Sequence, residues 1–274
     1  TGPDPGLNGE VFSHLTGREN PSFVYTPIYG PLSEKGVTLE VALLPPFTKG
    51  SGILNRIFSY LSSVNYLLFV LPKGGECLGA FKEFSEEAEE AGISLRRPKG
   101  EVTIEKVPSG GIRIVGSVND AEPDEIVRLL HSYGFVNAVV KIVGDVSLDE
   151  LEKWVLGIRY HVPCSLCYPR GRSLGLVDLD DGSFREVKSR GELIDLLLER
   201  LSLIRVYTKP PKEDPREEPI IMEGGSTIED LAEKIHSRLK ERFRYAIVWR
   251  GGKHVKVSKN FVLKDGDVVE IRAY

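Results

Sequence analysis

The sequence lacks long hydrophobic runs and is poor in cysteine and methionine. No uninterrupted apolar run reaches about eighteen residues, the length that spans a membrane, so we expect no transmembrane helix among its 274 residues. No positively charged start precedes a short apolar run, and we therefore expect no secretory signal in this sequence. The three cysteines show no framework of spacings, which favours a reducing compartment, the cytoplasm. The single Met is not residue 1, which leaves a longer native chain open.

Charge is unevenly distributed, although the net charge is only −4. From Ile204 onward, 15 Lys and Arg residues stand against 12 Asp and Glu, a net of +3. The preceding 203 residues carry 21 against 28, a net of −7. An anionic partner is therefore expected at the C-terminal part of the chain, although an ordinary solvated surface also accounts for so small an excess.

Strands and helices alternate in the first part of the chain, after a loop predicted for residues 1–9. Residues 37–44 and the continuous apolar run 66–71 read as strands, whereas residues 53–61 and 81–91 have the apolar spacing of helices. This alternation predicts an α/β layered sheet.

The pattern of predicted strands and helices differs between residues 96 and 153. Residues 101–107 and 112–118 alternate in the manner of a hairpin joined across a Pro-Ser-Gly-Gly turn. A helix, a strand and a second helix follow, and Ser147 with Glu150 forms a capping box for that second helix. The block has the size of a small αβ module.

The C-terminal part has the clearest pattern. A strand starts at residues 205–208, and a capping box at Ser226 and Glu229 opens a helix that runs to about Phe243. Two strands pair across Gly251-Gly252, and a last strand follows a turn at residues 265–267. A small sheet around one helix is the ubiquitin-like β-grasp arrangement.

Several segments resemble a known family. Residues 204–211 (IRVYTKPP), 233–236, 243–249 and 263–269 are similar in order and spacing to the TGS domain of the developmentally regulated GTP-binding proteins, an Obg-related group. A weaker similarity extends upstream, for example at Val162-Pro163-Cys164.

The resemblance implies an α/β fold in three parts. Residues 1–95 and 154–203 would form a P-loop GTPase-like layered sheet domain, with residues 96–153 as an inserted αβ module and residues 204–274 as a TGS β-grasp domain. The strands at residues 66–71 and 161–166 should then lie in one sheet.

The nucleotide-binding motifs of that family are altered in this chain at three separate places. Where a P-loop has Gly-Lys-Ser, with the Lys for phosphates and the hydroxyl for Mg²⁺, the sequence reads Leu7-Asn8-Gly9. Where the family has DxxG, Leu43 replaces the Asp and Pro46, which lacks an N–H, replaces the Gly. Where NKxD would accept hydrogen bonds from guanine, the sequence reads Pro169-Arg170-Gly171-Arg172, with Arg172 in place of the Asp.

These changes predict a non-catalytic pseudo-GTPase that needs no cofactor. The alternative is a GTPase that binds GTP and Mg²⁺ in an unconventional pocket. Residue 1 falls at the P-loop position itself, so the strand that normally precedes the loop lies outside this sequence, and residues before Thr1 could complete such a pocket.

Other groups of potentially metal-binding or catalytic residues are explained by ordinary structural roles. Cys164 and Cys167 have the spacing of a zinc knuckle, but the sequence has no second such pair, and Cys77 and His161 are the only candidates to complete four ligands. Strand alternation also places Cys164 and Cys167 on opposite faces. The acidic run around Asp178 reads as a turn rather than a Ca²⁺ loop. We therefore predict no metal site, and the five histidines belong to no recognisable nucleophile motif.

Basic residues of the predicted β-grasp domain form the remaining candidate site. Lys234, Arg238 and Arg242 recur at helical spacing on one face, and Tyr245 and Trp249 lie nearby. Further cations follow on the adjacent strands: Arg244, Arg250, Lys253, His254 and Lys256. This pattern suits an RNA backbone, although a solvated helix face with interleaved glutamates explains it too.

The family resemblance favours partners in translation, namely the ribosome, RNA or a translation-related protein, bound through the TGS domain and without a membrane. A protein-binding scaffold that uses the edge of the β-grasp sheet is a further alternative.

Overall fold

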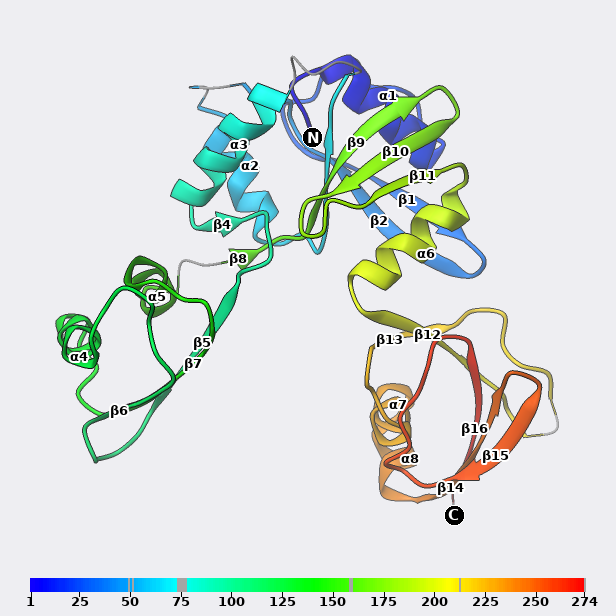
Figure 1. The fold of residues 1–274 in the computed structure, drawn as a ribbon. Coiled ribbons are helices and arrows are strands. Elements are labelled where there is room, and N and C mark those ends of the chain that lie inside the picture. Colours follow the sequence, from blue (N-terminus) through cyan, green and yellow to red (C-terminus); the bar gives the residue numbers. More distant parts are fainter. Residues whose placement is uncertain (49, 51, 73–77, 158–159, 212, 274) are drawn as a thin grey trace.

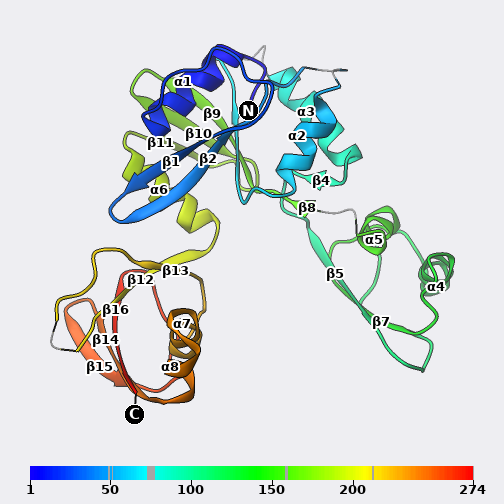
Figure 2. The same cartoon turned by 180° about the vertical axis from the view of Figure 1, so that it is seen from behind.

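The computed structural model describes residues 1–274 apart from 49, 51, 73–77, 158–159, 212 and 274. Figure 1, and Figure 2 from behind, show a sheet domain that holds the N-terminus, a small αβ module to one side of it, and a C-terminal domain built on a sheet and two helices. None of the helices among the described residues has the length and apolar character needed to cross a membrane.

The sheet domain is assembled from both sides of the module. Its elements are α1 (Pro5–Thr16), β1 (Ile28–Glu34), β2 (Val37–Leu43), α2 (Leu54–Leu61), β3 (Leu67–Val70), α3 (Leu78–Glu90), β9 (Cys164–Arg170), β10 (Ser173–Asp178), β11 (Phe184–Val187) and α6 (Arg190–Arg200). Strands β1 and β2 form an antiparallel hairpin, and a separate four-stranded sheet has the order β11-β10-β9-β3.

Helix α1 begins earlier than the sequence pattern predicted. The Asp4 side chain caps the helix by accepting a hydrogen bond from the Leu7 N–H, and Pro5 lies in the first turn, where its missing N–H costs nothing. Gly17 ends the helix with a positive φ of 72°. The loop predicted for residues 1–9 is therefore wrong from Pro5 onward, because an Asp-Pro helix start outweighs the neighbouring glycines.

Strands β3 and β9 are far apart in sequence but adjacent and parallel in the sheet. Leu67 lies opposite Cys164, and the pairing continues to Val70 opposite Cys167. The prediction that these two segments share one sheet is confirmed.

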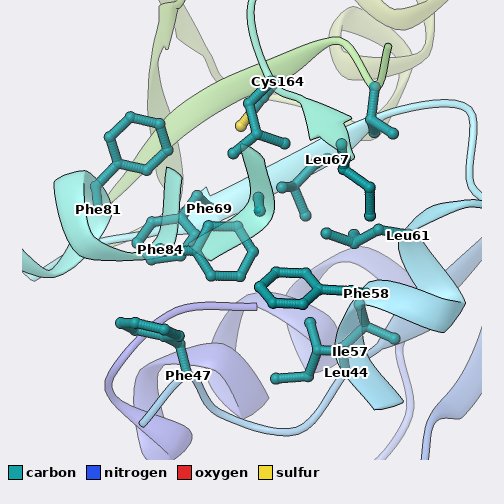
Figure 3. Packing of buried hydrophobic residues seen from close by; sticks show 14 of the residues in the cluster. Leu44, Phe47, Ile57, Phe58, Leu61, Leu67, Phe69, Phe81, Phe84 and Cys164 are labelled. Carbon is teal, nitrogen blue, oxygen red and sulfur yellow. The ribbon is translucent and has the colours of Figure 1, made fainter. Parts of the chain in front are cut away.

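Helices cover both faces of this sheet. On one face, α2 and α3 pack against β3, and Figure 3 shows their aromatic side chains meeting there. The Phe84 ring is fully buried, and its centroid lies 4.8 Å from that of Phe69 and 5.2 Å from that of Phe47. On the other face, α1 and α6 pack against β3, β9 and β10 through a second cluster that includes Leu15 and Leu193.

The αβ module has its own core. Its elements are β5 (Gly100–Lys106), β6 (Ile112–Val115), α4 (Pro123–Ser132), β7 (Ala138–Gly144) and α5 (Leu148–Val155). The capping box of Ser147 and Glu150 is confirmed. A short pair of strands, β4 (Ile93–Ser94) and β8 (Tyr160–His161), lies where the chain leaves and re-enters the sheet domain.

The hairpin predicted within this module is wrong. Strand β7 lies between β5 and β6, antiparallel to the first and parallel to the second. Val140, at the centre of β7, is fully buried. The most apolar strand therefore takes the central position, where both of its edges are paired, and the more charged β5 stays at an edge.

The C-terminal domain is a five-stranded sheet of order β13-β12-β16-β14-β15. Its elements are β12 (Leu203–Thr208), β13 (Ile220–Glu223), α7 (Ile228–Ile235), α8 (Ser237–Glu241), β14 (Phe243–Arg250), β15 (Lys253–Val257) and β16 (Asp267–Ala273). Strands β12 and β16 are parallel, and the other neighbours are antiparallel. This is the β-grasp arrangement.

The helix of this domain differs from the prediction in two ways. It starts one residue later, with Thr227 and Asp230 as the capping box. It also breaks at His236, whose extended backbone (φ −170°, ψ 130°) separates α7 from α8. Ile235, the last residue of α7, is 40% exposed.

Arg205 connects the C-terminal domain to the sheet domain. Its guanidinium donates to Asp195 on α6 at 2.5 Å and to Asp265, before β16, at 2.6 Å. The Arg205 backbone N–H also donates to Asp265 at 2.7 Å. These hydrogen bonds raise the pKa of the guanidinium, which therefore stays charged.

The aromatic cluster makes the sheet domain sensitive to truncation of Phe84. We expect Phe84→Ala to lower the free energy of unfolding by about 3–4 kcal/mol, because it leaves a cavity among rings that cannot collapse into it. Urea unfolding followed by circular dichroism measures this loss.

Leu78→Ala, on the same helix α3, is the matched control. Leu78 is 50% exposed, so its truncation should change the stability by no more than about 0.5 kcal/mol. Equal losses for the two variants would contradict the packing described here.

Candidate functional sites

The P-loop position is part of a regular helix. Leu7, Asn8 and Gly9 lie in the first turns of α1. The Leu7 N–H donates to the Asp4 carboxylate at 3.1 Å, and the Asn8 N–H donates to the Asp4 carbonyl at 3.0 Å. The Asn8 bond is the first ordinary bond of the helix, whereas the Leu7 N–H is one of the free donors that a phosphate at a helix N-terminus would use. The Asp4 carboxylate therefore already occupies one of these donors.

The side chains at this position also face the protein. Asn8, which stands where the P-loop Lys would be, is 3% exposed, and its Nδ2 donates to the Gly2 carbonyl at 2.9 Å. A Cβ added to Gly9 would lie 2.3 Å from the carbonyl oxygen of Pro21. A serine hydroxyl for Mg²⁺ therefore has no room here unless the loop at Pro21 moves.

The DxxG position is closed by hydrogen bonds to the N-terminal segment. Leu43 is buried, the carbonyl of Pro45 accepts from the Thr1 hydroxyl at 2.8 Å, and the Phe47 N–H donates to the Gly2 carbonyl at 3.0 Å. Pro46 is also buried. The two segments that would surround a phosphate and its Mg²⁺ are thus bonded to one another.

The NKxD position lies at a hairpin turn. Pro169 and Arg170 end β9, Gly171 takes a positive φ of 68°, and the chain returns at once as β10 with Ser173 opposite Arg170. The Arg170 guanidinium lies 5.1 Å from the centroid of the Phe184 ring. Arg172, exposed in the turn, places a cation where a guanine base would need a carboxylate.

A cavity of about 450 Å³ lies between β2 and β3, inside the sheet domain. Aliphatic side chains from α1, α2, α6 and both strands make up most of its lining, and Glu40 is the one acidic side chain in it. Among the described residues that line it there is no lysine or arginine side chain, so the cavity offers no cationic side chain to a phosphate.

The cysteine and aspartate groups serve the structure. Cys164 packs in the cluster under α2 and α3 and Cys167 in the one under α1 and α6, so they face opposite sides of the sheet as predicted. Burial raises the pKa of the Cys167 thiol to about 12 and that of Cys164 also, which disfavours the thiolate form that metals bind. Cys77 lies outside the described residues. Asp178 accepts from two N–H groups of its own turn and pairs with Arg200 at 3.3 Å.

The basic stripe predicted on one helix face is divided by the helix break. Lys234 is on α7, and its ammonium donates to the Ile221 carbonyl of β13 at 2.7 Å. Arg238 lies on α8 beyond His236, and Arg242 is the residue that ends α8. The three side chains therefore do not share one continuous helix face, and the predicted geometry is wrong.

Arg250, predicted to contact RNA, has a structural role. Its Nε and Nη2 each donate to a carboxylate oxygen of Asp267 at 2.7 Å, and Asp267 is fully buried. These bonds raise the pKa of the guanidinium. Lys253, in contrast, is exposed on β15.

The structure gathers Arg244 and Lys256 around Tyr245. The Lys256 ammonium lies 4.0 Å from the centroid of the Tyr245 ring, and the Arg244 guanidinium lies 5.9 Å from it. Lys209, which the sequence reading left out, lies 5.8 Å from the centroid of the Trp249 ring. No local pattern links Lys209 to Trp249, because the two residues meet only through the sheet.

Comparison with known proteins agrees with this architecture. Residues 204–273 match the TGS domain family. The chain is 27% identical over 281 residues to developmentally-regulated GTP-binding protein 1 of Xenopus laevis, covering 95% of this chain and 76% of that protein. It is 31% identical over 265 residues to GTP-binding protein 1 of Schizosaccharomyces pombe, covering 90% and 72%. A crystal structure of a GTP binding protein from Pyrococcus horikoshii OT3 overlaps with 32% of this chain and 26% of that one, at 30% identity and a TM-score of 0.27.

The fold and these matches define a class: a GTPase-like α/β protein with an inserted αβ module and a C-terminal TGS domain. Within that class, the chain belongs to the family of developmentally regulated GTP-binding proteins.

The role of Arg250 can be tested by removing its charge. We expect Arg250→Gln to lower the free energy of unfolding by about 2 kcal/mol, because the buried Asp267 carboxylate loses its ionic partner. Lys253→Gln, which changes an exposed lysine of the next strand, should have almost no effect. Thermal or urea unfolding of the two variants makes the comparison, and equal stability would contradict the structural role.

Proposed function

We propose that this protein is a non-catalytic member of its family, a pseudo-GTPase of the cytoplasm whose TGS domain binds RNA in a ribosome- or other translation-related assembly. The observation that carries the non-catalytic part is the start of α1, where the Asp4 carboxylate accepts a hydrogen bond from the Leu7 N–H, a donor that a phosphate would need. The cramped position of Gly9 and the cation at Arg172 support the same conclusion.

The electrostatics of the three altered positions act against GTP together. A triphosphate brings several negative charges, which GTPases balance with the P-loop Lys and Mg²⁺. Here the matching residues are Asn8 and Leu43, both buried and uncharged, and Asp4 adds a negative charge. A bound nucleotide would face repulsion at its phosphates and lose the carboxylate that recognises guanine.

The RNA-binding part rests on charge. The TGS domain carries the positive excess of +3, whereas the rest of the chain carries −7. A broad RNA-binding surface over the whole molecule is therefore unfavourable, and binding would be confined to the TGS domain.

A GTP-binding function is the second candidate, and the names of the relatives favour it. The proteins from Xenopus laevis and Schizosaccharomyces pombe are named GTP-binding proteins. Under this alternative, GTP and Mg²⁺ would be bound in an unconventional way at the same three positions.

Nucleotide titration separates the two candidates. We expect calorimetric titration of the full chain with GTP and GDP in the presence of Mg²⁺ to give no guanine-selective binding in the micromolar range, with ATP as the control nucleotide. Micromolar binding of GTP or GDP that is clearly tighter than that of ATP would refute the pseudo-GTPase proposal, and GTP turnover above buffer would refute it independently.

RNA binding is tested by its dependence on salt and on charge. The parent chain should bind labelled single-stranded RNA with a log–log salt slope of about −0.7 for each phosphate contact. We expect a strong loss of binding when four cations of the TGS domain are reversed to Glu, namely Arg238, Arg242, Lys253 and Lys256.

The matched control reverses four cations outside the TGS domain to Glu: Arg18, Lys35, Arg113 and Lys188. Its total charge change is the same, so non-specific repulsion is equal in the two variants. If both variants bind RNA equally, or if the parent binds none, the RNA-binding part of the proposal is wrong.

A further inference from the structure

The five-stranded sheet of the TGS domain has one face without a helix. Figures 1 and 2 show α7 and α8 together on one side of the sheet. Ala246 and Val248 of β14 point to that side and are fully buried. Because side chains alternate along a strand, Tyr245, Ile247 and Trp249 point to the opposite face, which we call the open face.

Neighbouring strands add cations to the open face. Lys256 on β15 lies opposite Ile247, and His254 lies opposite Trp249. The Lys256 ammonium stands 4.0 Å from the centroid of the Tyr245 ring, and the His254 ring lies 6.1 Å from the Trp249 ring at an angle of 36°. The Tyr245 ring is thus bordered by a lysine and the Trp249 ring by a histidine.

The charge on this face favours an anionic ligand. Lys209 reaches it from the segment after β12, 5.8 Å from the Trp249 ring, and Arg244 reaches it from the start of β14. The carboxylate that β16 places on the same face is Glu270, which is ion-paired with Arg272 of its own strand. The acid is therefore ion-paired within the face. The cations lie near the Tyr245 and Trp249 rings, and the Lys209 ammonium also donates to the Glu213 carbonyl.

We propose that the open face is a stacking platform for single-stranded RNA, in which Tyr245 and Trp249 each stack one base while Lys209, Arg244 and Lys256 neutralise phosphates. This inference rests on the RNA-binding function proposed above and names the surface and the strandedness of the ligand. When RNA binds, bases would replace the cations on the faces of the two rings. The displaced cations would then contact the phosphates next to the stacked bases.

The geometry favours unpaired bases. Tyr245 and Trp249 are four residues apart on one strand, about 13 Å, so they take separate bases. In an RNA duplex the bases are stacked on one another and their major-groove edges are out of reach, so rings on a flat sheet can contact only its backbone. A single strand can instead turn its bases onto the rings.

Trp249 provides a direct signal for stacking. The chain has two tryptophans, and the other, Trp154, lies on α5 in the inserted module. In a Trp154→Phe background, we expect a short oligouridylate to quench the fluorescence of Trp249 in a saturable way. A duplex of the same length should bind more weakly and cause little quenching.

Substitutions separate stacking from charge. Tyr245→Leu and Trp249→Leu should each weaken the binding of labelled oligouridylate by about tenfold, within the range for loss of one stacked base, and leave the salt slope unchanged. Lys256→Gln should reduce the magnitude of the salt slope by about 0.7, because one phosphate contact is lost. Arg113→Gln/Lys188→Gln, which changes two exposed cations outside the TGS domain, is the control and should leave the quenching unchanged.

The outcomes are distinguishable. If RNA binds but Trp249 fluorescence does not change and the Tyr245 and Trp249 variants bind like the parent, the stacking platform is wrong while the proposed RNA function stands. Equal binding and equal quenching by the duplex also overturn it. If the parent binds no RNA at all, both proposals fail.

Circular dichroism and the urea midpoint of each variant establish that it is folded. If an aromatic variant unfolds, Lys256→Gln, which changes an exposed side chain, still tests the proposal.

Discussion

The parallel pairing of β3 with β9 is the constraint on which the rest of the molecule depends. Leu67 and Cys164 lie side by side although almost a hundred residues separate them in sequence. Everything between them must leave the sheet and return to the same place, which the short pair β4–β8 achieves at the base of the inserted module. The same pairing gives α2 and α3 one face of the sheet to cover and leaves the other to α1 and α6.

Sequence patterns predicted those strands and helices whose apolar spacing alone defines them. They failed where the structure of a segment depends on which other strand it pairs with. The continuous apolar strand β3 and the β-grasp arrangement of the C-terminal domain were both predicted. Strand β1 was missed because Pro31 interrupts it, which an edge strand tolerates. The false hairpin arose because the distant β7 competes for both strands. The break at His236 leaves the apolar spacing of the helix intact, so no periodicity reveals it.

The candidate sites were likewise predictable from the sequence only in part. The residues at the three positions that the family resemblance matches to nucleotide motifs could be read from the sequence, but their surroundings could not. The contact between Gly9 and Pro21 depends on how the following loop returns to α1. Among the cations of the TGS domain, sequence could not separate Arg250, held by a buried carboxylate, from Lys256, which lies over a ring. A sequence shows which side chains are charged, but it does not show which residue each of them contacts in the fold.

The two ion pairs of Arg205 have a mechanical consequence. They span the joint between α6 and β12, so turning the TGS domain about that joint requires the guanidinium to leave Asp195 or Asp265. Both carboxylates are 44% exposed at their side chains, and mobile ions therefore weaken the contact. We therefore expect the joint to be stiffer at low ionic strength than at high ionic strength. In the proposed RNA complex, the orientation of the open face would then depend on the same salt that screens its phosphate contacts.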